Sequence, residues 1–394
     1  MPNVTNVFGL LEKLKSNDIA VYQNRCVVVR NRNATCTRCA DACTSGCISL
    51  VGNELIISPE KCVGCGTCAT MCPTCALEAL HPTDTDLLQS AVKATQAAEG
   101  EAIIACEQLL AAAEGLYDPE KLVGVTCLGR VEEALLTSLV VEGAAHISLV
   151  KAKCAECDCA VGLTTAEAVC ATANTLLEAW SKEARADIVE KLPAIARLKD
   201  DKGYDYNKRE FFSGLRDDAK TAAVVTTDFA VKGALGVEEE VEPKFVKVQA
   251  DGALPRFIPV RREILLQNLA ALGEPQDIMI DTRLWGHVVI DMDLCNSCQM
   301  CATFCPTGAI VKVDEAEGSF GIDHSPSLCV KCRCCTDICY KNALSLSDEV
   351  FAVDILSGMK ERTEMKRPKF TPGGPHSMHN AIKDLIGIEE IYER

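Results

Sequence analysis

The sequence is poor in aromatic residues and histidine, and it contains no long apolar run. Aromatic residues make up 5% of the 394 residues, and histidine occurs 6 times. No stretch of about 18 apolar residues is present, so we expect no transmembrane segment. Residues 1–20 lack a basic stretch followed by an apolar core, which is the pattern of a secretory signal. We therefore expect a cytoplasmic protein whose thiols stay reduced.

Basic charge is scarce as well, since 40 lysines and arginines face 56 acidic residues and the formal net charge is −16. Nucleic-acid binding needs a basic face, so we exclude that class of partner. An acidic surface is compatible with docking to basic patches on redox partners. The sequence also lacks a P-loop, a flavin or nicotinamide fingerprint and a Ser–His–Asp signature. We accordingly predict no catalytic residues and no organic cofactor.

Cysteine, in contrast, occurs 25 times, and reduced thiols in this number indicate metal binding. Two runs toward the C-terminus have the spacing C-x2-C-x2-C-x3-C, which is typical of the cubane clusters of bacterial-type ferredoxins. Three closely spaced thiolates can wrap one cluster, and the fourth, carried away on a helical turn, reaches the neighbouring cluster. The two expected sites are Cys295, Cys298, Cys301 with Cys339, and Cys329, Cys332, Cys335 with Cys305.

A similar pair of runs lies near the N-terminus, and the first of them is one residue longer, with the spacing C-x2-C-x3-C-x3-C. By the same exchange, the expected sites are Cys36, Cys39, Cys43 with Cys72, and Cys62, Cys65, Cys68 with Cys47. A zinc ribbon would need paired knuckles a dozen or more residues apart, and these cysteines are too closely spaced. The radical-SAM spacing C-x3-C-x2-C also occurs, ending at Cys75, but no barrel pattern follows it.

Between these runs the sequence alternates between helical and strand patterns. We expect helices near 84–99, 130–143 and 165–182, with strands at 101–106, 121–127 and 146–150. Strands separated by such helices indicate a parallel sheet, and its carboxyl edge is where ligands bind. Cys106, Cys127 and Cys154 fall at or just beyond strand ends, so we expect them to converge there, with Cys157 or Cys159 close enough to supply a fourth thiolate. The alternative is that these cysteines serve as small apolar core residues.

The central stretch resembles the delta iron–sulfur subunit of methyl-viologen-reducing hydrogenase. The shared features are a strand ending in cysteine, a turn of the type Cys127-Leu128-Gly129-Arg130, and the C-x4-C pair Cys154 and Cys159. The resemblance implies a cluster that relays electrons, and position predicts Cys106, Cys127, Cys154 and Cys159 as its ligands, with Cys157 as a spare. The outer modules resemble polyferredoxin-type subunits of anaerobic redox complexes.

We expect α+β ferredoxin-like dicluster modules at both ends and a small central α/β parallel-sheet domain. The expected segments are a dicluster module (1–81), the α/β iron–sulfur domain (82–182), a mostly helical linker (183–280), a second dicluster module (281–350) and an extended docking tail (351–394). Smaller expectations are helices at 7–15, 184–198, 259–272 and 381–392, and strands at 26–30 and 285–292.

Together these features predict an electron-transfer subunit with four [4Fe–4S] clusters and one further central cluster, [2Fe–2S] or [4Fe–4S]. It would relay electrons between a donor and a catalytic subunit (a molybdopterin enzyme, a hydrogenase or a flavoprotein) in a hetero-oligomer. The central cluster would bridge the two outer modules. The alternative is a reductase whose central cluster itself binds substrate. The observation behind this alternative is the surplus thiol of Cys157 or Cys159.

Overall fold

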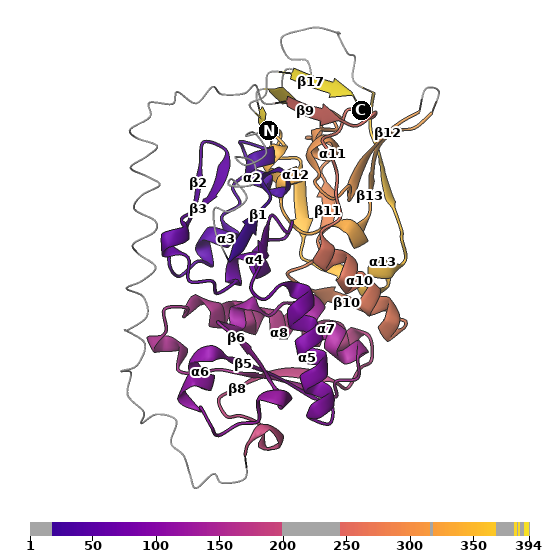
Figure 1. Cartoon of the computed structure of the whole chain (residues 1–394). Helices are drawn as coiled ribbons and strands as arrows, with labels where there is room; N and C mark the ends of the chain where they lie inside the picture. Colours follow the sequence, from indigo (N-terminus) through magenta and orange to yellow (C-terminus); the bar gives the residue numbers. More distant parts are fainter. Residues whose placement is uncertain are drawn as a thin grey trace, which may run out of the picture.

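The computed structural model describes residues 18–198, 245–315, 318–367, 382–383, 385–386 and 390–393. Three parts follow one another along the chain (Figure 1): an N-terminal module (residues 18–81), a central domain (82–198) and a C-terminal module (245–367). The two outer modules lie next to each other, with the central domain below them in the view of Figure 1. The helix expected at 7–15 lies outside the described residues.

The N-terminal module consists of two small strand pairs and three short helices. Its elements are β1 (Ile19–Val21), α2 (Val27–Arg30), α3 (Arg38–Asp41), β2 (Ile48–Val51), β3 (Glu54–Ile57), α4 (Thr67–Met71) and β4 (Leu77–Ala79). β1 pairs with β4 and β2 with β3, both antiparallel. The β2–β3 hairpin turns at Gly52 and Asn53, both with positive φ.

The strand expected at 26–30 is wrong, because this segment forms the single helical turn α2. Three consecutive valines favour a strand by intrinsic preference. However, Val27 is buried in an apolar cluster with Phe304 and Ile338 of the C-terminal module. Tertiary packing of this kind outweighs local preference.

The central domain contains a four-stranded parallel sheet in the order β6-β5-β7-β8. The strands are β5 (Glu101–Cys106), β6 (Val123–Val125), β7 (His146–Val150) and β8 (Arg185–Val189). The first three were predicted. The fourth replaces the helix expected at 184–198, which is wrong. The Asn174 side chain donates to the Ala186 carbonyl and accepts from its amide at 2.9 Å each, and it thereby fixes β8 beside β7.

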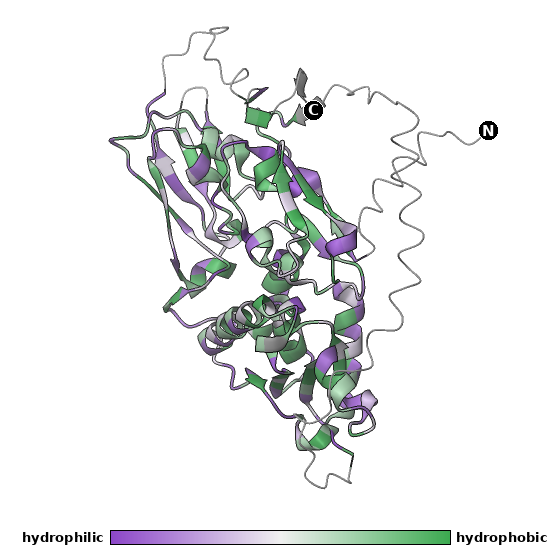
Figure 2. Ribbon diagram, turned by 90° about the vertical axis from the view of Figure 1, so that its left-hand side faces the viewer, coloured by the Kyte–Doolittle hydropathy of each residue, from purple (hydrophilic) through white to green (hydrophobic). Residues whose placement is uncertain are grey.

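Four helices accompany this sheet: α5 (Asp84–Ala97), α6 (Glu107–Ala112), α7 (Glu133–Val141) and α8 (Val161–Ala179). The Thr83 hydroxyl accepts a hydrogen bond from the Asp86 amide at 3.1 Å and thereby caps the N-terminus of α5. Ile104, Leu136 and Leu149 are fully buried between sheet and helices. Much of this part carries hydrophobic colouring in Figure 2. None of the described helices is long and apolar enough to span a membrane.

The C-terminal module contains most of the remaining described elements. They are α10 (Val260–Leu272), β10 (Met279–Asp281), β11 (His287–Ile290), α11 (Met300–Phe304), β12 (Ile310–Asp314), β13 (Phe320–His324), α12 (Cys334–Ile338), β14 (Leu344–Ser347), β15 (Glu349–Phe351), α13 (Ala352–Leu356) and β16 (Glu361–Glu364). β11 pairs with β14, and β10 with β15, whereas β12, β13 and β16 form a three-stranded sheet. The predicted helix at 259–272 and the predicted strand at 285–292 are both confirmed, as α10 and β11.

The end of the chain differs from the expected helix at 381–392. Residues 382–383 and 385–386 are helical, and residues 381, 384 and 387–389 lie outside the described part. Glu390–Glu393 forms strand β17, which pairs in parallel with β9 (Phe245–Val248). A strand partner far away in sequence therefore determines this last segment.

Candidate metal centres

Three of the four cysteine runs, at 62–72, 295–305 and 329–339, share one backbone shape. In each run, the residue before the second cysteine and the residue after it have positive φ, which curls the loop around a common centre. These residue pairs are Gly64 and Gly66, Ser297 and Gln299, and Lys331 and Arg333. A five-residue helix (α4, α11 or α12) follows at once and ends one residue before the fourth cysteine. The fourth thiol is thus carried away from the loop, as the spacing predicted.

Backbone amides point at several of these sulfurs. Hydrogen bonds to Sγ come from the amides of Ala76 to Cys72 (3.2 Å), Ser297 to Cys295 (3.4 Å), Ile310 to Cys305 (3.5 Å) and Ala343 to Cys339 (3.4 Å). Such bonds stabilise anionic sulfur and tune the potential of an iron–sulfur cluster. All 25 cysteines are free thiols. The donor set and its amides therefore fit cubane clusters.

The C-terminal module brings together the predicted thiol sets. Burial raises the pKa of Cys335, and the neighbouring thiols Cys332, Cys329, Cys305 and Cys301 raise it further. The pKa of Cys298 is raised by burial and then by Cys339 and Cys295. The fourth cysteine of each run thus lies beside the other run.

In the N-terminal module, only the second predicted site has its cysteines close together. Burial and the thiols of Cys65, Cys39, Cys62 and Cys47 raise the pKa of Cys68. This environment includes the four cysteines predicted for that site. Cys47 is thereby placed beside the second run.

The first N-terminal run has a different conformation. It enters helix α3 directly after Thr37, and the Cys43 Sγ lies 3.4 Å from the Cys47 Sγ. Burial raises the pKa of Cys39 to about 12, with contributions from the thiols of Cys72, Cys26 and Cys36. The structure thus groups Cys36, Cys39 and Cys72 with Cys26, a residue that the spacing did not single out. Cys26 precedes α2, ten residues upstream of the run, so no local motif could have identified it.

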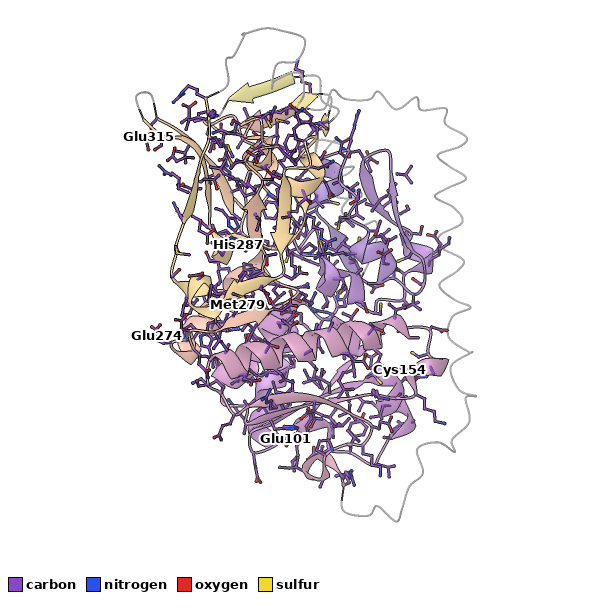
Figure 3. The ribbon with its side chains drawn as sticks, turned by 180° about the vertical axis from the view of Figure 1, so that it is seen from behind. Glu101, Cys154, Glu274, Met279, His287 and Glu315 are labelled. Carbon is purple, nitrogen blue, oxygen red and sulfur yellow. The ribbon has the colours of Figure 1, made fainter. Side chains whose placement is uncertain are left out.

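The central cysteines converge at the carboxyl edge of the parallel sheet. Cys106 ends β5, and its Sγ accepts a hydrogen bond from the Ala152 amide beyond β7 at 3.3 Å. The pKa of Cys106 is raised by burial and then by the thiols of Cys127 and Cys157. Cys154 has a similar environment, in which Cys106, Cys127 and Cys157 add to the effect of burial. It lies near the end of α8 (Figure 3).

Cys159 lies on the other side of this group, at the boundary with the N-terminal module. The Cys159 side chain is within hydrogen-bonding reach of both Cys65 and Cys127, and this interaction lowers the pKa of Cys65 to about 6 and that of Cys127 to about 7. In this arrangement Cys157 joins Cys106 and Cys154, whereas Cys159 connects Cys127 with the cluster loop at 62–68. The sequence analysis preferred Cys159 as the fourth ligand and kept Cys157 as the alternative, and that choice stays a prediction.

Glycines allow this boundary to close tightly. An added Cβ at Gly66 would lie 2.3 Å from the Arg130 Cδ, and one at Gly129 would lie 2.5 Å from the Thr67 Oγ1. At Gly162 it would lie 2.2 Å from the Cys127 Sγ. The Cys127-Leu128-Gly129-Arg130 turn is therefore pressed directly onto the N-terminal cluster loop.

The two outer modules also contact each other directly. The Asp337 carboxylate accepts a hydrogen bond from the Thr35 amide at 2.8 Å, and Arg38 donates to the Lys331 carbonyl at 2.9 Å. Cys36 packs against the apolar cluster that Cys298 and Cys332 also border. The central domain contacts the C-terminal module as well, because the Asn268 side-chain amide donates to the Ala134 carbonyl at 3.0 Å and Arg283 pairs with Glu133 at 2.6 Å. The cysteine edge of the central domain meets the N-terminal module, and that module meets the C-terminal one. The expectation that the central cluster bridges the two modules stays a prediction.

Two stretches of the chain match the 4Fe-4S binding domain family, residues 55–78 and 288–311. Each contains one complete C-x2-C-x2-C-x3-C run. No curated protein matches the chain. The two matches and the loop geometry support iron–sulfur binding of the ferredoxin type and an electron-transfer role.

Proposed function

We propose that this chain is a multi-cluster electron-transfer subunit with two dicluster ferredoxin modules, at 1–81 and 281–350. Four [4Fe–4S] clusters would be held by the cysteine sets predicted from the sequence. For the first N-terminal site, Cys26 is the alternative to Cys43. The central domain, which resembles the hydrogenase delta subunit, would hold a fifth cluster through Cys106, Cys127, Cys154 and Cys157.

The observation that carries this proposal is the contiguous order of the thiol groups. The Cys159 thiol lies between Cys65 and Cys127, and so links the central group to the second N-terminal site. On the opposite side of the N-terminal module, Cys36 borders the apolar cluster shared with Cys298 and Cys332. The path would therefore run from the central domain through the N-terminal module to the C-terminal module.

Iron–sulfur clusters supply one-electron acceptance and donation, and the residues of the chain supply the surroundings that permit it. Arg30 is 7% exposed and lies among the thiols of Cys334, Cys305 and Cys332. A cation at this boundary favours the extra negative charge of a reduced site on either side. The backbone amides that donate to the cysteine sulfurs also favour the reduced, more negative state of a cluster.

A relay of this kind needs a catalytic partner. The net charge of −16 favours docking to a basic surface. We propose a hetero-oligomer with a molybdopterin enzyme, a hydrogenase or a flavoprotein of anaerobic metabolism, and a cytoplasmic location. The position of Cys159 argues against the alternative of a substrate-binding central cluster, because its thiol is engaged with Cys65 and Cys127.

The test uses the full chain, purified anaerobically and titrated with a reduced viologen. A relay takes up one electron for each cluster, returns all of them to an added oxidant, and turns over no small substrate alone. Paramagnetic resonance of the reduced protein should show broad signals from interacting clusters. Steady turnover of a small substrate without a partner would favour the reductase instead.

A further inference from the structure

A second group of metal-ligating side chains lies in the C-terminal module, and none of its members is a cysteine. His287 begins β11, His324 ends β13, and Glu361 begins β16, where it is the register partner of His324. One potential ligand atom from each residue lies within 4.8 Å of the other two. His287 is labelled in Figure 3, in the part of the structure above β10.

His324 is the most unusual member of this group. It is 3% exposed, and within the described part of the chain neither of its ring nitrogens has a hydrogen-bond partner. Its ring meets the His287 ring edge to face, with centroids 5.7 Å apart. A buried polar group without a partner destabilises the folded state. A buried imidazole in this state, beside a second imidazole and a carboxylate, is arranged to receive a ligand that supplies the missing bond.

We propose that His287, His324 and Glu361 bind one divalent transition-metal ion, with zinc as the reference metal. Two ligands of tetrahedral zinc, each about 2.0–2.1 Å from the metal, are roughly 3.4 Å apart. The His287 Nε2 and the Glu361 Oε2 are already 3.3 Å apart. Two nitrogens and one oxygen are a common zinc donor set, with the fourth position left to water.

The group lies where two sheets of the C-terminal module meet. β11 belongs to the sheet with β14, whereas β13 and β16 belong to the three-stranded sheet with β12. β16 pairs with β13 along one side. A metal ion at this point would join the two sheets and fasten β16, because metal-binding energy acts as folding energy. The side chains of His287 and Glu361 are 35% and 36% exposed, so the ion can enter from solvent.

This proposal is independent of the electron relay, and its test must separate zinc held by nitrogen and oxygen from zinc held by thiols. The full chain, purified anaerobically, is treated with a chelator, given one equivalent of zinc, and measured by elemental analysis and X-ray absorption at the zinc edge. We expect one zinc per chain, with a shell of nitrogen and oxygen that includes two imidazoles. Sulfur in the zinc shell, or no retained zinc, would overturn the proposal.

The decisive variant is Glu361→Gln, which keeps the size of the side chain. Its matched control is Glu364→Gln, an exposed position on the same strand. We expect zinc affinity to fall about tenfold or more in the first variant, since loss of a supporting partner alone costs that much. The second variant should bind as the wild type does. Equal affinity in both variants would refute the site, and because neither residue is in the core, the comparison stands even if His324→Gln fails to fold.

Discussion

Gly162→Ala tests the tight boundary between the central domain and the N-terminal cluster loop. Gly162 is the second residue of α8, and alanine inside a helix is up to about 1 kcal/mol more favourable than glycine. Helix propensity alone therefore predicts a more stable protein. The structure predicts the reverse, because the new Cβ would lie 2.2 Å from the Cys127 Sγ.

The magnitude follows from this distance. Ordinary contacts begin at 3.4 Å, so the sulfur or the helix must move by about 1.2 Å (3.4 − 2.2). Overpacking of this kind costs about 1–3 kcal/mol, which exceeds the gain in propensity and leaves a net loss of up to about 2 kcal/mol. A displaced Cys127 sulfur should also release the central cluster while the outer clusters remain.

The assay is iron content per chain, together with the midpoint of anaerobic thermal unfolding. Gly124→Ala is the control, since the nearest atoms to its Cβ would be the Leu110 Cδ1 at 3.0 Å, the end of a flexible side chain, and the Glu107 Cγ at 3.8 Å. We expect Gly162→Ala to lose about two to four irons and the control to keep them. Full iron content together with a raised midpoint in Gly162→Ala would refute the reasoning.

The remaining predictions concern single cysteines. Cys305→Ala should alter the spectrum of the site formed by the last cysteine run, and an altered signal from its own run would contradict cluster sharing. Cys127→Ala should abolish the central cluster, whereas Cys170→Ala, a change in the apolar core, should leave it intact. If both variants keep the same iron content, the central cysteines are packing residues and not ligands. Cys26→Ser should cost the first N-terminal cluster more iron than Cys43→Ser does, and the opposite order would restore the spacing-based assignment.

Where neighbouring residues alone determine the ligand geometry, the sequence was sufficient to predict the loop. The spacing C-x2-C-x2-C-x3-C predicted a loop, a helical turn and a fourth thiol that lies away from the loop. The runs ending at Cys72, Cys305 and Cys339 adopt this arrangement. Strand ends likewise located Cys106 and Cys127, because parallel strands deliver their last residues to one edge.

Where contacts between distant segments determine the structure, the sequence was not sufficient to predict which residues lie together. Cys26 and Cys159 owe their positions to packing between segments. Cys26 belongs to no motif, and the C-x4-C pair of Cys159 does not indicate that Cys65 lies beside it. The first strand-like stretch became α2 because Val27 packs on the C-terminal module. His287, His324 and Glu361 lie on three separate strands. The pairing of β13 with β16 brings His324 to Glu361, and the packing of the β11–β14 sheet against them adds His287.

The most direct test of the account is the iron and acid-labile sulfide content of the anaerobically purified chain. Four cubane clusters contain about sixteen irons, and the central cluster adds about two to four, with sulfide in equal number. The account predicts this total, with zinc limited to about one ion per chain at the histidine site. Zinc in several equivalents with little iron or sulfide would contradict it, because the cysteine runs would then be zinc sites and the chain could carry no electrons.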